Sequence, residues 1–179
     1  MHPMTPLPDI TAVASEIRRG VEVTLQNHCY VDSAILIYSG IDSMAYLSMP
    51  ESQDDVTRFD FVQWCDRYIR PDHPHAPTSL ELYAARCGVV HSHSAASRLF
   101  RDGGKVRQLF YMSDTRNPVL FDPAINKEML LLSVPALCGW FFDGLDRFIA
   151  DLRADSELAR IANVRLENIL HTATTSKAP

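Results

Sequence analysis

The segment from Tyr30 to Met49 constrains the fold of this chain more than any other. Its apolar side chains recur at helical spacing on more than one side of the helix axis: Ala34, Ile35, Ile37, Tyr38, Ile41, Met44, Ala45 and Leu47. A surface helix shows a single apolar stripe, whereas a helix that is apolar over most of its circumference needs cover on several sides. We therefore expect this helix at the structural centre, buried by several neighbouring helices or by a partner chain.

Five further segments have the spacing of helices with an apolar face, and they span residues 10–25, 54–69, 78–93, 127–153 and 156–170. The residues expected to cap or open them are Asp9 or Thr11, Asp54–Asp55, Thr78, and Ser156. The apolar stripe of the last helix passes through Val164 or Arg165. A bundle of about five or six helices is therefore predicted.

Residues 98–122 are predicted to depart from the helical pattern. The turn signal Asp102-Gly103-Gly104-Lys105 lies between two β-prone runs, 98–101 and 106–111. A third extended piece is expected at Val119–Phe121. A sheet this small has to pack on helices to be stable. The predicted fold class is all-α, with a small β-hairpin insertion at residues 98–122.

The longest nearly apolar run, Met129–Phe142, is predicted to be a buried core helix with a kink at Pro135. Its 14 residues are too few to cross a bilayer as a helix. The first residues, MHPMTPLPDI, lack the charged and apolar regions of a secretion signal. We therefore expect a cytoplasmic protein without a membrane segment.

Length and charge bound the function classes. The 179 residues fit a single domain, with residues 1–8 and 173–179 as loose termini. Apolar residues at 46% and charged residues at 22% are typical of a globular protein and exclude disorder as the main state. A net charge of −5 argues against nonspecific nucleic-acid binding through the overall field, although a local basic patch can still hold a phosphate backbone.

The cysteines and histidines do not form a recognisable metal motif. The cysteines are dispersed and predicted to be free thiols: Cys29, Cys65, Cys87 and Cys138. The pairs His73-x-His75 and His91-x-His93 are poor bidentate clamps, because alternate residues of an extended segment point to opposite faces. We predict no metal and no cofactor; phosphate-binding, dinucleotide and serine-hydrolase motifs are also absent from the sequence.

Thr78 to His93, TSLELYAARCGVVHSH, carries the candidate chemistry. Thr78 and Glu81 have the spacing of a capping box, so a helix is expected to begin there. Arg86 and His91 follow five residues apart on that helix. Arginine offers a permanent positive charge that suits phosphate, and histidine exchanges a proton near neutral pH.

The spacing Arg86-Cys87-Gly88-Val89-Val90-His91 resembles the R-X4-6-H motif of the HEPN-domain superfamily. The preceding apolar segment, Tyr30–Met49, is similar to the core helix that precedes the motif in that superfamily. The resemblance implies a helical bundle that dimerises, and a metal-independent endoribonuclease with Arg86 and His91 as the catalytic pair, twice per dimer. It further implies a toxin or defence effector with a possible antitoxin partner. The residue after the motif arginine is often polar in catalytic members, and here it is Cys87.

On an ideal helix, five residues place Arg86 and His91 about 140° apart around the axis. They can converge if the helix bends or unwinds between Gly88 and Ser92, or if two chains meet in a dimer. A purely structural role is the alternative. Arg86 then pairs with Glu81 or Asp32, and His91 bonds a carbonyl at the helix end.

Four basic residues follow the motif: Arg98, Arg101, Lys105 and Arg107. Beside His91 they could guide RNA phosphates, or they could be the charged edges of a solvated hairpin. Two functions are therefore expected. The first is a HEPN-like endoribonuclease that forms a homodimer through its central apolar helices; the second is a noncatalytic helical module that binds a protein partner or a small ligand.

Overall fold

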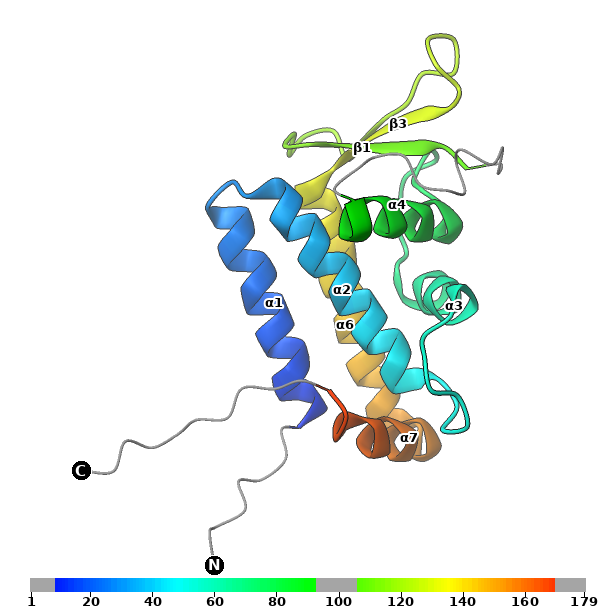
Figure 1. Ribbon diagram of the computed structural model, residues 1–179. Coiled ribbons are helices and arrows are strands. Elements are labelled where there is room, and N and C mark those ends of the chain that lie inside the picture. The colour runs from blue at the N-terminus through cyan, green and yellow to red at the C-terminus, as the bar shows by residue number, and fades with distance from the viewer. Residues whose placement is uncertain (1–8, 93–105, 170–179) are drawn as a thin grey trace, which may run out of the picture.

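The computed structural model describes residues 9–92 and 106–169, and for residues 90–92 it describes the backbone only. Within these ranges the chain forms six helices and a small sheet (Figure 1). The helices are α1 (Ile10–Gln26), α2 (Tyr30–Ser48), α3 (Arg58–Tyr68), α4 (Ser79–Ser92), α6 (Val134–Ala154) and α7 (Ser156–Leu166). The strands are β1 (Gln108–Met112), β2 (Val119–Leu120) and β3 (Met129–Ser133).

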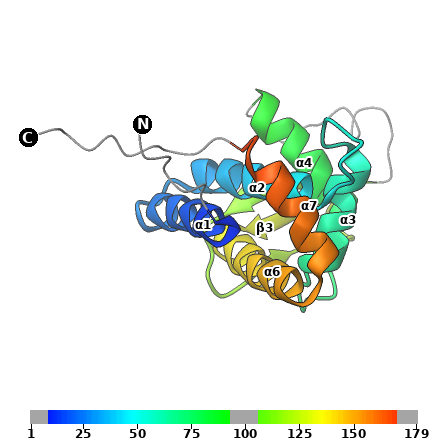
Figure 2. The same ribbon diagram turned by 90° about the horizontal axis from the view of Figure 1, so that it is seen from below.

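The long helices α1, α2 and α6 form the body of the bundle, and α3 and α4 pack beside α2 (Figures 1 and 2). The sheet covers one end of the bundle, and α7 lies at the other end. The architecture is mostly helical with a small sheet, in agreement with the predicted helical-bundle class. None of the helices in the described ranges has the length and apolar character needed to span a membrane.

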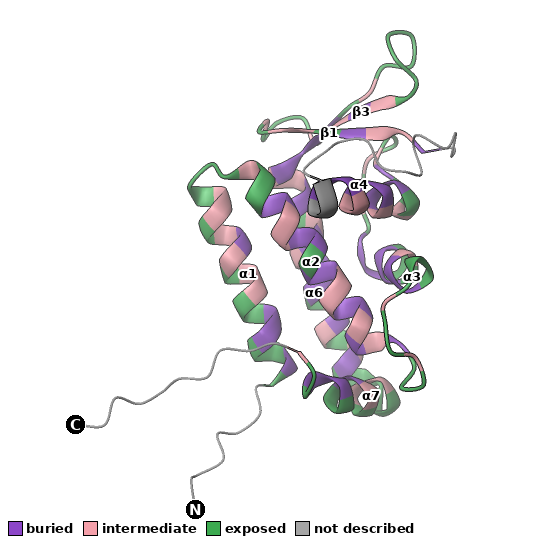
Figure 3. Cartoon of the chain, viewed as in Figure 1, coloured by how far each residue is buried: buried purple, intermediate pink, exposed green. Residues whose placement is uncertain are grey.

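α2 lies at the centre of the bundle, as predicted. It contacts each of the other five helices and β1. Its buried residues form a broad face over about half of the helix circumference at 100° per residue, and Ile37, Ile41 and Met44 in that face are fully inaccessible (Figure 3). Although Val31 remains 52% exposed, several helices of the same chain therefore cover this broad apolar face of α2. A partner chain is not required to explain it.

One cap confirms the expected start of a helix, and two others correct the expected starts. Asp9 accepts from the Thr11 amide and caps α1. The third helix does not begin at Asp54–Asp55: Thr57 and Asp60 form a reciprocal capping box, which opens α3 one turn later. The last helix is capped by Asp155, whose side chain accepts from two amides, rather than by Ser156. In both corrections the side chain that satisfies the free amides of the first turn sets the start.

The prediction of a helix over residues 127–133 is wrong. Residues Met129–Ser133 form β3, the central strand, and Leu130 and Leu132 are fully buried on the face toward the helices. A short apolar run fits a buried strand as well as a buried helix, and only the partners decide between them. Ser133 then caps α6, and Pro135 lies in the first turn, where its missing N–H costs nothing, so it makes no kink.

The sheet has the order β1-β3-β2, with β1 parallel and β2 antiparallel to β3. The extended piece at Val119–Leu120 is confirmed as β2. Residues 98–105, the expected first strand and turn of the hairpin, lie outside the described residues. The partner of β1 is β3, whose paired residues lie 21 positions further along the chain, and the sequence analysis does not predict this pairing.

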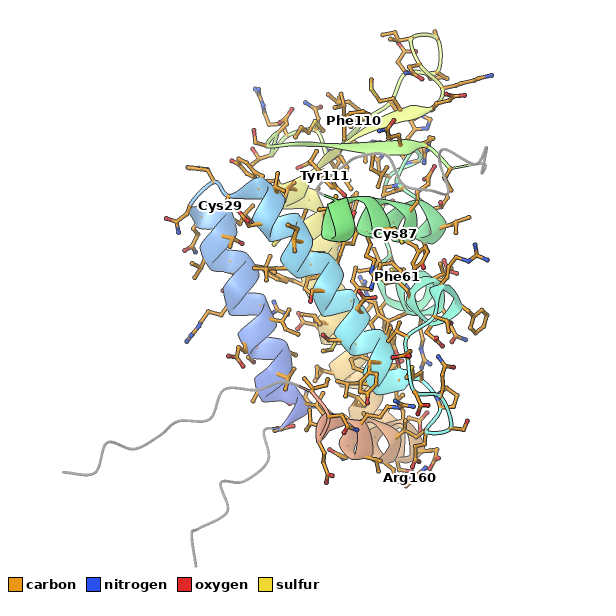
Figure 4. All side chains as sticks on the ribbon, viewed as in Figure 1. Cys29, Phe61, Cys87, Phe110, Tyr111 and Arg160 are labelled. Carbon is orange, nitrogen blue, oxygen red and sulfur yellow. The ribbon has the colours of Figure 1, made fainter. Side chains whose placement is uncertain are left out.

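β1 joins the sheet to the helical core. Figure 4 shows Tyr111 on the helix side of β1 and Phe110 on the opposite side. The hydroxyls of Tyr111 and the fully buried Tyr38 of α2 lie 2.8 Å apart and share a hydrogen bond. Burial raises the pKa of both phenols, so both stay protonated and one of them donates.

Arg165, and not Val164, faces the interior from α7. Val164 is 47% exposed, whereas Arg165 is 4% exposed. The Arg165 guanidinium donates to the carbonyls of Met49 and Gln53, at 2.9 and 2.7 Å, and to that of Pro50. These carbonyls lie just beyond the end of α2. A buried arginine on α7 therefore donates hydrogen bonds to the backbone carbonyls that follow the end of α2.

Two glycines test the close packing of α2. A Cβ at Gly40 would lie 2.6 Å from Cζ of Phe141 and 2.9 Å from Cγ2 of Ile17, whereas one at Gly139 of α6 would meet nothing within 4 Å. We expect Gly40→Ala to lower the free energy of unfolding by about 1 to 3 kcal/mol through overpacking. Gly139→Ala should raise it by about 0.5 to 1 kcal/mol, because alanine favours a helix interior. Urea unfolding measures the free energy of unfolding of both variants. An equal change in the two variants would contradict the close packing around Gly40 of α2.

Candidate functional site

The start of α4 is fixed by Glu81, which forms hydrogen bonds with Thr78 and with both the side chain and the backbone of Arg107. Its carboxylate accepts from the Thr78 amide at 2.8 Å, and the Glu81 amide donates to the Thr78 hydroxyl at 3.2 Å, so the predicted capping box is confirmed. The same carboxylate receives the Arg107 guanidinium, at 2.7 and 2.8 Å, and the Arg107 amide at 2.9 Å. Glu81 thus joins the first turn of α4 to the residue that precedes β1.

The ionised form of Glu81 is strongly favoured. Burial acts to raise its pKa, but the hydrogen bonds from Arg107 and Thr78 outweigh burial and hold the pKa below its ordinary value. The Glu81 side chain is only 5% exposed. Removing its charge would leave the Arg107 guanidinium with a neutral partner in a poorly hydrated place.

Arg86 points from α4 toward α2 and pairs with Asp42. Its Nε lies 2.8 Å from Oδ2 of Asp42, and its NH2 nitrogen lies 2.8 Å from the same oxygen. Burial acts to lower the pKa of Arg86, but the Asp42 carboxylate raises it above its ordinary value. The two side chains remain 23% and 22% exposed. Arg86 is therefore a permanently charged group, held in one orientation and still in contact with solvent.

The partner of Arg86 is neither Glu81 nor Asp32, which were the expected alternatives. Glu81 is engaged by Arg107, and Asp32 lies in the first turn of α2, whereas Asp42 lies three turns further along. The sequence feature that indicates this partner is the Asp42 carboxylate in the middle of the apolar segment 30–49. A charge inside an otherwise apolar helix needs a partner, and Asp42 is such a charge.

Tyr83 and Cys87 lie beside Arg86 on α4. Burial, followed by a hydrogen bond with the Cys87 thiol, raises the pKa of Tyr83. The Tyr83 ring meets Phe61 of α3 edge to face, with 5.5 Å between ring centroids. Figure 4 shows Cys87 on α4 and Phe61 on the neighbouring α3. The surroundings of Arg86 are therefore aromatic and sulfur-containing, with Asp42 as the countercharge.

His91 lies in the last turn of α4, and its side chain lies outside the described residues. α4 stays helical from Ser79 to Ser92 and does not unwind after Gly88. Unwinding after Gly88 was one of the two ways in which Arg86 and His91 could converge. Their positions in a single chain therefore remain about 140° apart around the helix axis.

Of the four basic residues that follow the motif, the structure describes only Arg107. Arg98, Arg101 and Lys105 lie outside the described residues. Arg107 donates to the carbonyls of His75 and Ala76, at 3.3 and 3.0 Å, in addition to Glu81, and stacks 4.8 Å from the centroid of the Phe121 ring. Its contacts are those of a structural residue, which differs from the predicted contact with RNA phosphates.

The His73–His75 pair and the cysteines are the remaining candidates for metal ligands. His73 Nδ1 accepts from the His75 amide at 3.2 Å, so that pair is part of a local turn. Cys29, Cys65, Cys87 and Cys138 are free thiols. Across the ranges 9–92 and 106–169, no three His, Cys, Asp or Glu side chains gather as they would around a metal ion.

Nothing matches this chain among protein-family models, curated proteins or solved structures. The HEPN resemblance therefore stays a prediction that rests on the motif and its helical context.

The ion pair between Glu81 and Arg107 has a testable effect on stability. We expect Glu81→Gln to lower the free energy of unfolding at pH 7 by about 3 kcal/mol, since it leaves a largely buried guanidinium without its charge partner. Glu157→Gln is the matched control, because Glu157 bonds Arg160 in the same way at the surface. Urea unfolding should show no measurable decrease in the free energy of unfolding for Glu157→Gln. An equal decrease in both variants would contradict the stabilising role of the buried Glu81–Arg107 pair.

The same pair predicts a dependence on pH. The folded-state pKa of Glu81 lies below its ordinary value of about 4.5. Its contribution is therefore fully present above that value and is lost as the pH falls through the lower, folded-state pKa. The difference in unfolding free energy between wild type and Glu81→Gln should be constant from pH 8 to pH 6 and shrink below about pH 4.5. A difference that grows on acidification would contradict this.

Proposed function

We propose that this protein is a HEPN-like, metal-independent endoribonuclease with Arg86 and His91 as its catalytic pair. The observation that carries the proposal is the state of Arg86. Its guanidinium is held by Asp42 at 2.8 Å, yet about a quarter of its side chain faces solvent. A cation that is oriented before the substrate arrives can stabilise developing negative charge without reorganisation.

The proposed reaction divides the work between the two residues. In the proposed dimer, the neutral His91 imidazole of one chain removes the proton from a ribose 2′-hydroxyl, and the protonated His91 of the other chain gives a proton to the leaving 5′-oxygen. The 2′-oxygen attacks the adjacent phosphorus, the bond to the 5′-oxygen breaks, and a 2′,3′-cyclic phosphate remains. Arg86 binds the phosphate oxygens, on which negative charge accumulates in the transition state.

Two chains are part of the proposal. Because α4 is continuous to Ser92, Arg86 and His91 of one chain are not brought together by a break in the helix. A homodimer in which two α4 helices face each other would supply both groups to one phosphate. The interface would lie along α4 on the side where Arg86, paired with Asp42, still contacts solvent.

Candidate phosphate contacts are Arg98, Arg101 and Lys105, which follow α4 in the sequence. Arg107 is given a structural role instead, because its guanidinium donates hydrogen bonds to Glu81 and to two backbone carbonyls. Replacing Arg98 and Lys105 together should weaken RNA binding and flatten its salt dependence, because each phosphate contact releases counterions. Filter binding at two salt concentrations measures this, and an unchanged slope would contradict the role of both residues.

The decisive measurement is cleavage of a mixed, labelled RNA pool in EDTA. We expect wild type to give 2′,3′-cyclic phosphate ends, and Arg86→Ala and His91→Ala each to lose at least about 100-fold in rate. Arg18→Ala is the matched control, because Arg18 pairs with Asp146 at 2.6 Å and its side chain is 31% exposed. Circular dichroism and mass measurement confirm that each variant is folded and report its assembly.

Cleavage that survives in both α4 variants would contradict the catalytic pair. A folded wild-type protein that cleaves nothing in the pool would favour the second function, a noncatalytic helical binding module. Loss of activity in Arg18→Ala as well would show that the α4 variants act through stability instead of chemistry.

A further inference from the structure

The outer face of the three-stranded sheet is apolar and reaches solvent. Phe110 of β1 and Leu120 of β2 both pair with Leu131 of β3, so the three side chains form one row across the sheet. Side chains alternate between the two faces of a strand, and Leu130 and Leu132, on either side of Leu131, are fully buried toward the helices. The row therefore points away from the bundle, as Figure 4 shows for Phe110.

This face leaves a contiguous apolar area open to solvent. Phe110, Leu120 and Ile125 are 36%, 43% and 80% exposed. These three side chains alone leave roughly 300 Å² open, which is the size of the largest apolar patch on a typical monomer, and such a patch often marks an interaction site. A cavity of about 250 Å³ lies on the same face, and its walls are Leu120, Phe121, Ile125, Met129 and Leu131, with Asp122 and Asn126 as the polar members.

The strand pattern is that of a sheet covered on both faces. β1 and β3 run parallel, and parallel strands are ordinarily buried between two layers and read as continuous apolar runs. β3 fits this pattern, because Met129 and Leu131 lie on its outer face and Leu130 and Leu132 on its inner face. The helices supply the inner layer only, so the outer face is left to a second layer.

Residues 1–8 and 170–179 are too short to supply that layer. α1 begins at the end of the bundle opposite the sheet, where α7 also lies (Figure 1). Eight residues extend over at most about 29 Å, and ten over about 36 Å. α1 and α6 reach from that end to the sheet with 17 and 21 residues, which is about 25 and 32 Å, and the outer face lies about 10 Å beyond them.

The charges beside this face suit a second copy of the same chain. The connection between β2 and β3 carries Asp122, Lys127 and Glu128, and the connection between β1 and β2 carries Asp114 and Arg116. In a two-fold dimer the same surface meets itself, so a rim of one sign would repel its copy. Here acidic and basic groups alternate, and the rim does not oppose pairing with itself.

We propose that the outer face of the sheet is a self-association surface, against which the same face of a second copy packs about a two-fold axis. The apolar rows of the two sheets interdigitate, as they do in sheets packed face to face. Because the open area is well below the roughly 800 Å² per partner of a standard interface, the dimer is reversible, with a Kd of roughly 10 to 500 μM. The surface goes beyond the proposed nuclease interface, because α4 packs on the other side of β1.

Sedimentation equilibrium of the full chain, from about 5 μM to about 1 mM, measures this association. We expect the weight-average mass of wild type to rise with concentration. Ile125→Asp puts a charge into the apolar interface and should weaken the association at least about tenfold. Val164→Asp is the matched control, because Val164 is an exposed apolar residue of α7, at the other end of the bundle, and this variant should associate as wild type does.

Amide resonances of the ¹⁵N-labelled protein locate the surface. On dilution, the resonances of Phe110, Leu120 and Leu131 should move and those of α7 should stay in place. Movement confined to α4 would overturn the assignment to the sheet.

Equal masses for wild type and Ile125→Asp at every concentration would overturn the proposal, since this face would then be covered within the chain or take a different partner. An equal weakening in Val164→Asp would overturn it too. Association lost in Arg86→Ala and kept in Ile125→Asp would assign the contact to α4 instead. Ile125→Asp should cleave RNA at the wild-type rate, so a failure of the nuclease and a failure of this surface are told apart.

Discussion

The burial of α2 is the constraint on which the rest of the structure depends. A helix with so broad an apolar face gains stability only when several neighbours cover it, and each fully buried Ile or Met contributes roughly 1.5 to 3 kcal/mol. α1, α3, α4, α6 and α7 each cover part of it. Close approach is possible because Gly40 leaves room for Phe141 and Ile17. The other helices thus take their positions from the surface that α2 offers them.

Charged groups inside this apolar bundle connect one element to another. Asp42 joins α2 to α4 through Arg86, and Glu81 joins α4 to β1 through Arg107. Removing the Glu81 charge would leave the Arg107 guanidinium charged and poorly hydrated, which is strongly unfavourable. Such pairs therefore fix the relative positions of the elements that they join. In α4 they also orient the guanidinium on which the proposed reaction depends.

The parts of the fold that the sequence predicts well are those decided within one or two turns. The cap at Thr78 and Glu81, and the helical spacing of residues 30–48, are local signals, and both are confirmed. The later start of α3 has a local signal too, because Thr57 and Asp60 have the spacing of a capping box, but the acidic pair at 54–55 is an equally local signal for an earlier start. The candidate site was predicted as a pair of positions on one helix, without its countercharge.

What the sequence by itself determined is the set of helices, the central place of α2 and the spacing of Arg86 and His91 on one helix. Periodicity and capping are properties of neighbouring residues, so they can be deduced from the printed chain. The tertiary structure decided that Met129–Ser133 is a strand and that Asp42 holds Arg86. Both depend on residues about 20 or more positions away, and an apolar run or a lone carboxylate acquires its role only when the fold supplies the partner.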